Sequence, residues 1–121
     1  MKLLHHAFRL YVEPAIFDRT IAFYEALQGI SCERRIPFPH LGINVAVVGA
    51  FIVLAGTKEA LSGFREASSL LVVDDLDGTL SWAVDEGATV LHGPQDAPGG
   101  RNATVRNPDG LVAEYYQPMS S

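Results

Sequence analysis

The sequence predicts an α+β fold built from two similar β-α-β modules. The segment Phe17–Phe23 reads almost residue for residue like Leu76–Trp82. Each segment follows an apolar run, opens a short amphipathic helix and is followed by a glycine, Gly29 or Gly87. Short β-rich segments come after each helix. Internal similarity of this kind indicates a repeated structural unit. Two fused modules leave a cleft between their sheets, and we expect a small molecule to bind there.

Length and composition narrow the class of protein. A chain of 121 residues suits one domain with a real core. The net charge of −5 and the lack of a basic patch argue against a nucleic-acid partner. No apolar stretch approaches the ~20 residues of a membrane span, and the N-terminus lacks a signal-peptide core. The single cysteine, Cys32, fits a reducing compartment. We therefore expect a cytoplasmic protein without a membrane partner.

The first module should open with a strand and a helix. Residues 3–12 alternate in polarity, which is typical of a strand with one face on a core. Asp18 is the expected N-cap of the helix, apolar residues then recur at helical spacing, and Gly29 ends it. The strand faces divide as follows: His6, Phe8, Leu10 and Val12 on one, and His5, Ala7, Arg9 and Tyr11 on the other.

The rest of this module should be β-rich. We expect a strand at 31–36 and a loop at 37–40, because the two prolines there cannot donate to a strand ladder. Strands at 43–48 and 50–55 should form a hairpin at Gly49. The more polar segment 57–67 joins the modules and is expected to hold a helical turn.

The second module repeats this plan. Its glycine- and proline-rich segment 93–100 is expected to be a loop. Asn107–Gly110 is a strong turn signal with proline at its second position. The regular elements we expect are, in order, a strand at 70–73, a helix at 77–86, and strands at 89–91, 102–106 and 111–116.

The order of these motifs resembles the vicinal oxygen chelate superfamily, which includes glyoxalase I, extradiol dioxygenases, fosfomycin-resistance enzymes and bleomycin-resistance proteins. The resemblance implies a single domain over residues 1–121, with modules at about 3–56 and 68–118. It implies an incompletely closed eight-stranded barrel with helices outside, and a homodimer. The matching segments are Leu3–His5, Thr20 with Phe23 and Tyr24, Val73–Leu76, Gly87–Thr89, Gly93–Pro94, and Asn107–Gly110 through Glu114.

The resemblance also implies four positions for metal ligands. Two of them hold suitable residues, His5 and Glu114, whereas the other two hold Ser68 and Val53. A catalytic divalent site needs about three protein ligands, and the arrangement of two histidines and one carboxylate for iron needs a second histidine. The loop residues His40 and His92 are further candidates, but they do not match the family positions.

The expected cavity carries aromatic surface and a few polar groups, which suits a flat or partly aromatic molecule with an oxygen or acid function. Arg9 would hold a carboxylate or enolate oxygen, or else pair internally with Glu114. Trp82 and Phe23 are expected to pack their helices onto the sheet. The candidate ligand-binding residues are His5, Arg9, Tyr11, Phe38, His40, Arg106, Glu114 and Tyr116.

Three functions follow from these observations. The incomplete ligand set favours a metal-free binding protein of the bleomycin-resistance type, with an aromatic or antibiotic-like ligand and no cofactor. The alternative is a lyase, isomerase or dioxygenase that uses His5 and Glu114 with Zn, Ni, Mn or Fe. The third is a dimeric scaffold with a vestigial cavity, against which Arg9 and Glu114 argue. The sequence assigns no catalytic residue.

Overall fold

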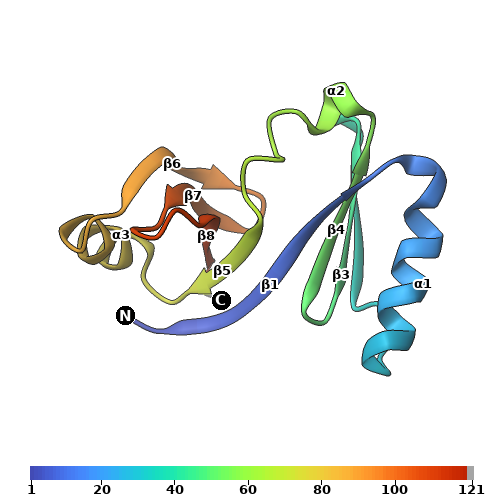
Figure 1. The fold of residues 1–121 in the computed structure, drawn as a ribbon, viewed down its shortest axis with the longest axis horizontal. Coiled ribbons are helices and arrows are strands. Elements are labelled where there is room, and N and C mark those ends of the chain that lie inside the picture. Colours follow the sequence, from blue (N-terminus) through green and yellow to red (C-terminus); the bar gives the residue numbers. More distant parts are fainter. Residues whose placement is uncertain (120–121) are drawn as a thin grey trace. The chain divides into compact units, whose positions relative to one another are not determined.

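The computed structural model describes residues 1–119 and consists of two compact units (Figure 1). We call residues 7–66 the N-terminal module, and residues 67–119 together with residues 1–6 the C-terminal module. The first residues join the C-terminal module through Lys2, whose backbone N–H donates to Asp74 Oδ1 at 2.8 Å. Each module follows the order β-α-β-β-β, so the predicted α+β class and the predicted repeat are confirmed.

The N-terminal module has the strand order β2-β3-β4-β1. Strand β1 runs parallel to β4, and the other neighbours are antiparallel. The predicted hairpin at Gly49 and the predicted helical turn before residue 67 are confirmed. The elements are β1 (Leu3–Val12), a 3-10 turn (Pro14–Ile16), α1 (Phe17–Gln28), β2 (Arg34–Phe38), a 3-10 turn (Pro39–Leu41), β3 (Ile43–Val48), β4 (Phe51–Gly56) and α2 (Lys58–Leu61).

Two predictions for this module are wrong. Asp18 is not the N-cap of α1, because the 3-10 turn leads into the helix and places Ile16 at the cap. Asp18 instead accepts a hydrogen bond from Arg35 Nη1 at 2.7 Å. Pro37 is not in a loop. It belongs to β2, which runs from Arg34 to Phe38. Strand β2 is at the edge of this sheet, where a residue without an N–H is tolerated.

The C-terminal module has the strand order β5-β8-β7-β6, again with its first and last strands parallel. Its helix begins one residue earlier than predicted, after Asp75, whose side chain accepts from Gly78 N at 3.1 Å. The predicted turn at 107–110 is confirmed by the hydrogen bond from Gly110 N to Asn107 O, at 2.9 Å. The elements are β5 (Ser69–Val73), α3 (Leu76–Asp85), β6 (Thr89–Ala97), β7 (Gly100–Arg106) and β8 (Val112–Pro118).

The predicted loop at 93–100 is wrong. Strand β6 continues to Ala97, and β7 begins at Gly100, so only two residues turn between them. Gly93 and Pro94, which suggested a loop, are accommodated within β6 because it is an edge strand with register shifts near His92. Bulges and edge positions are where strands tolerate these residues.

Each helix covers one face of its own sheet. Ile21 of α1 packs on Ala46, Val48 and Val53, and all four are buried. In the other module, α3 buries an apolar stripe of its residues against Val105 and other sheet residues. The prediction that Phe23 and Trp82 also pack on the sheets is wrong, since their exposed fractions are 60% and 50%. Both lie to the side of the buried stripe, about 120° around the helix.

No helix of residues 1–119 is long and apolar enough to cross a membrane.

Gln28 should be a strong determinant of stability in the N-terminal module. Its side chain donates to Val48 O (2.8 Å) and accepts from Ala50 N (2.8 Å), which joins the end of α1 to the β3–β4 turn. Gln28→Ala leaves both backbone groups without these partners, so we expect a loss of about 2 kcal/mol in the free energy of unfolding. Urea unfolding measures it. Gln95→Ala, on an exposed stretch of β6, is the matched control. Equal stability of the two variants would contradict this role.

Tyr115 should make the free energy of unfolding depend on pH in the alkaline range. Burial raises the pKa of its phenol above the ordinary value of 10.0, and the hydroxyl donates a hydrogen bond to Asn107 Oδ1. As the pH rises above 10, the unfolded chain loses this proton before the folded chain does, so the free energy of unfolding falls. Tyr115→Phe should remove that slope and cost about 1 kcal/mol at pH 7. Urea unfolding at a series of pH values tests this. An unchanged alkaline slope in the variant would assign the effect to other groups.

Candidate functional site

Strand alternation divides the N-terminal sheet into two faces with different chemistry. Leu10 and Val12 contribute to the core under α1, whereas Tyr11 packs with the cluster on the other face. We call this second surface the face opposite α1. It is largely apolar, and part of it is covered by Leu61 of α2 and by Phe64.

Arg9 and Tyr11 are held together on the face opposite α1. Arg9 lies beside Ile52 and Tyr11 beside Leu54 in the parallel β1–β4 ladder. The carbonyl oxygen of Phe64 accepts hydrogen bonds from the Tyr11 hydroxyl (2.5 Å) and from Arg9 Nη2 (3.5 Å). The guanidinium carbon of Arg9 lies 5.6 Å from the centre of the Tyr11 ring. A half-buried cation is thus positioned on an apolar surface by a backbone carbonyl and an aromatic ring.

Phe38 and His40 form an aromatic pair at the end of β2. Their ring centres are 6.2 Å apart in an edge-to-face arrangement. Phe38 is half-buried in the same cluster as Tyr11, whereas His40 is exposed in the following 3-10 turn. The structure therefore brings Arg9, Tyr11 and Phe38 to one face and leaves His40 at its margin.

The C-terminal module shows the same division. Ala113 and Tyr115 of β8 are buried beneath α3, so the alternating residues Glu114 and Tyr116 lie on the face opposite α3. Glu114 Oε2 accepts a hydrogen bond from Asn102 Nδ2 of β7 at 2.9 Å. The hydroxyl of Tyr116 donates to Pro98 O at 2.7 Å. A carboxylate and a phenol are thus fixed on one face by contacts inside the module.

The remaining sequence candidates lie at the edges of this module. Arg106, opposite Val112 at the end of β7, is exposed. His5 is also exposed, and its ring lies 6.3 Å from that of His6. Asn102 is not among the candidate residues that the sequence suggested. Its hydrogen bond to Glu114 makes it part of the candidate site.

The residues at the four family ligand positions do not provide a complete metal site. Val53 is fully buried beneath α1, and its strand neighbours on the opposite face are Ile52 and Leu54. The hydroxyl of Ser68 donates to Val112 O at 3.4 Å. Between residues 1 and 119, no group of three His, Cys, Asp or Glu side chains is arranged to hold a metal ion. His5 and Glu114 alone fall short of the three ligands that a catalytic divalent ion needs.

The two histidines outside the family positions do not complete this set. His40 belongs to the N-terminal module, at the margin of the face opposite α1. His92 lies opposite Thr104, which in turn lies opposite Glu114. Two strand spacings, about 10 Å, therefore separate His92 from Glu114 in this sheet.

Comparison with known proteins gives matches among solved structures only. No protein-family model matches the sequence, and no curated protein matches it either. An uncharacterized protein from Methanosarcina mazei is 35% identical, with a TM-score of 0.87, over 100% of this chain and 97% of that chain.

Enzyme structures with the same fold are more distant in sequence. A methylmalonyl-CoA epimerase from Mycobacterium tuberculosis is 14% identical, with a TM-score of 0.69, over 98% of this chain and 90% of that chain. A Streptomyces coelicolor methylmalonyl-CoA epimerase in complex with 2-nitronate-propionyl-CoA is 16% identical, with a TM-score of 0.65, over 98% and 100%. These likenesses show the fold.

The repeated β-α-β-β-β module, the order of its motifs and the matching folds agree on one assignment. The chain has the fold of the vicinal oxygen chelate superfamily.

Proposed function

We propose that the protein binds a flat or partly aromatic organic anion without the help of a metal ion. The observation that carries this proposal is the placement of Arg9. It lies on an apolar face, and its guanidinium is held by Phe64 O and by the ring of Tyr11. A planar guanidinium recognises a carboxylate or enolate through paired N–H donors. The aromatic rings of Tyr11 and Phe38 supply apolar contact for the rest of the ligand.

The C-terminal module carries groups of opposite character on a face of its own. Glu114 accepts from Asn102, and Tyr116 is held by Pro98, so both side chains have defined positions on the face opposite α3. Hydroxyl or amide groups of a ligand would meet an acceptor there. Such sites combine apolar surface with a few fixed polar groups. His40 contributes at the margin of the face opposite α1, His5 and Arg106 contribute at the edges of the C-terminal module, and a homodimer is part of the proposal.

The alternative is a metal-dependent lyase, isomerase or dioxygenase that uses His5 and Glu114. One observation favours it: both residues belong to the C-terminal module. Strand β1, which carries His5, neighbours β5, and β5 places Leu70 opposite Glu114. The shortage of ligands at Val53 and Ser68 counts against it.

Arg9 should determine affinity for an organic anion. We expect Arg9→Gln to weaken the binding of an aromatic carboxylate, salicylate or 2-naphthoate, measured in EDTA, by about ten-fold, because a hydrogen bond to a charged group is lost. Isothermal titration calorimetry measures the dissociation constant. Arg65→Gln, an exposed arginine in the same module, should leave it unchanged. Equal losses in both variants, or no binding of either compound, would contradict the proposal.

Metal retention separates the two functions. Protein loaded in turn with Zn, Ni, Mn and Fe(II) and then dialysed should retain well below one metal ion per chain, because the ligand set is incomplete. Mass spectrometry measures the ratio. His6→Ala is the matched control for His5→Ala. Near-stoichiometric retention that His5→Ala abolishes and His6→Ala preserves would overturn the metal-free function and favour the enzyme.

A further inference from the structure

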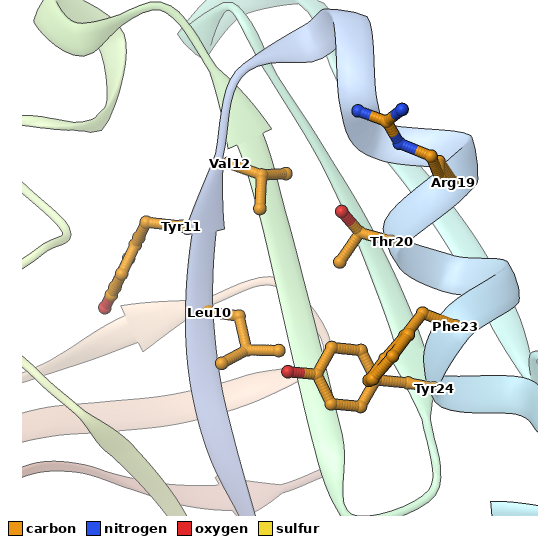
Figure 2. Close-up of a pocket in the computed structure, with 7 residues that line it drawn as sticks. All are labelled: Leu10, Tyr11, Val12, Arg19, Thr20, Phe23 and Tyr24. Atoms are coloured by element: carbon orange, nitrogen blue, oxygen red, sulfur yellow. The ribbon is translucent and has the colours of Figure 1, made fainter. Parts of the chain in front are cut away.

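A groove lies between α1 and β1, on the face of the N-terminal sheet that α1 covers. Its volume is about 470 Å³, within the range of ligand pockets. Figure 2 shows Leu10 and Val12 of β1 pointing toward the helix, while Tyr11 points to the other side of the strand. The groove is lined by Leu10, Tyr11, Val12, Arg19, Thr20, Phe23 and Tyr24. It is therefore separate from the face on which Arg9 lies.

The groove exists because α1 packs mainly over β3 and β4 and covers β1 only in part. Ile21 reaches Ala46 and Val48 of β3 and Val53 of β4, and these residues are buried. Leu10 and Val12 are only partly buried, although they belong to the same apolar surface. The first strand of the module thus keeps an apolar strip open to solvent.

The C-terminal module carries smaller residues at the corresponding helix positions. In the repeat, Ala83 takes the place of Tyr24, and Gly78 takes the place of Arg19. Ala83 is buried, and so is Val73 on the first strand of that module. A small residue lets a helix approach its sheet closely, whereas a tyrosine occupies the space between them. Arg19 and Tyr24, which supply the cation and one wall of the groove, therefore have no counterpart in the second repeat.

Thr20 and Thr79 occupy equivalent positions in the two helices but differ in burial. Each donates its hydroxyl to the carbonyl oxygen four residues earlier, Ile16 O at 2.8 Å and Asp75 O at 2.6 Å. The local geometry of the two helices is thus alike. Thr79 is nevertheless buried, whereas Thr20 is half-exposed in the groove.

The chemistry of the groove is that of an amphipathic anion site. Phe23 and Tyr24 meet edge-to-face with ring centres 5.0 Å apart, and Tyr24 lies 4.2 Å from the ring of Phe51. Figure 2 places the guanidinium of Arg19 at one end of this apolar strip. No carboxylate of residues 1–119 lines the groove, and the adjacent Asp18 is held by Arg35 at 2.7 Å. The groove thus carries positive charge next to apolar surface.

We propose that this groove binds a carboxylate with an aliphatic or aromatic tail. The carboxylate contacts Arg19, and the tail lies on Leu10 and Val12 against the rings of Phe23 and Tyr24. This site goes beyond the proposed function, because it uses the opposite face of the sheet. Tyr11 borders the groove, but its side chain points to the other side of β1.

Decanoate is the probe for this site, and decyltrimethylammonium is the cationic control of the same chain length. We expect decanoate to bind and to shift the amide NMR signals of Leu10, Val12 and Thr20. Arg19→Gln should weaken decanoate binding roughly three- to five-fold, the scale of an exposed ion pair, while Arg34→Gln leaves it unchanged. Thr20→Phe fills the groove and should abolish binding. Thermal unfolding of each variant checks that it remains folded.

Several results would overturn the proposal. Equal binding of the cation would remove the role of Arg19. Decanoate binding that survives Thr20→Phe, in a folded variant, or that is lost in Arg9→Gln and not in Arg19→Gln, would place the probe elsewhere. Sedimentation velocity gives the remaining test: if Thr20→Phe dissociates a dimer of the wild type, the groove is an interface between two copies of the chain and not a carboxylate site.

Discussion

The parallel register of β1 and β4 is the constraint on which the N-terminal site depends. It pairs Leu10 with Val53 and Tyr11 with Leu54. Alternation then sends the first pair beneath α1 and the second to the opposite face. A shift by one residue would place the guanidinium of Arg9 beneath the helix, where a cation without a partner is costly. The apolar packing of Ile21 on Val53 therefore fixes where the positive charge lies.

The same constraint explains why a single substitution at Val53 would not complete a metal site. Val53 matches a ligand position in sequence, but its side chain contributes to the core beneath α1. A carboxylate introduced there would be buried among apolar groups, not presented on the face opposite α1. A ligand on that face would have to replace Ile52 or Leu54, and Leu54 is itself buried in the second apolar cluster. The departure from the family pattern is thus a property of the packed core and not of one side chain.

Features set by local chemistry could be predicted from the sequence, and features set by edges or distant contacts could not. Gly29 ends α1 in the left-handed conformation, with φ of 68°, which glycine adopts readily. Pro37 misled the prediction because an edge strand leaves one side of its ladder unpaired. The contact of Tyr11 with Phe64 O spans 53 positions and has no local signal. Counting outward from the turn at 107–110 places Glu114 opposite Thr104, so its diagonal contact with Asn102 does not follow from the register alone.

The two copies of the repeat have also diverged in a coordinated way. In α3, Asp75 caps the helix by accepting from Gly78 N, and a Cβ atom at position 78 would lie 2.2 Å from Asp75 Oδ2. A larger residue there would displace the capping carboxylate. In α1, Ile16 takes the place of Asp75, and a 3-10 turn leads into the helix without a side-chain cap. Loss of the cap removes the steric restriction on the residue three positions later. The copy of the helix that lacks the capping aspartate is thus the one that can carry Arg19 beside an open apolar strip.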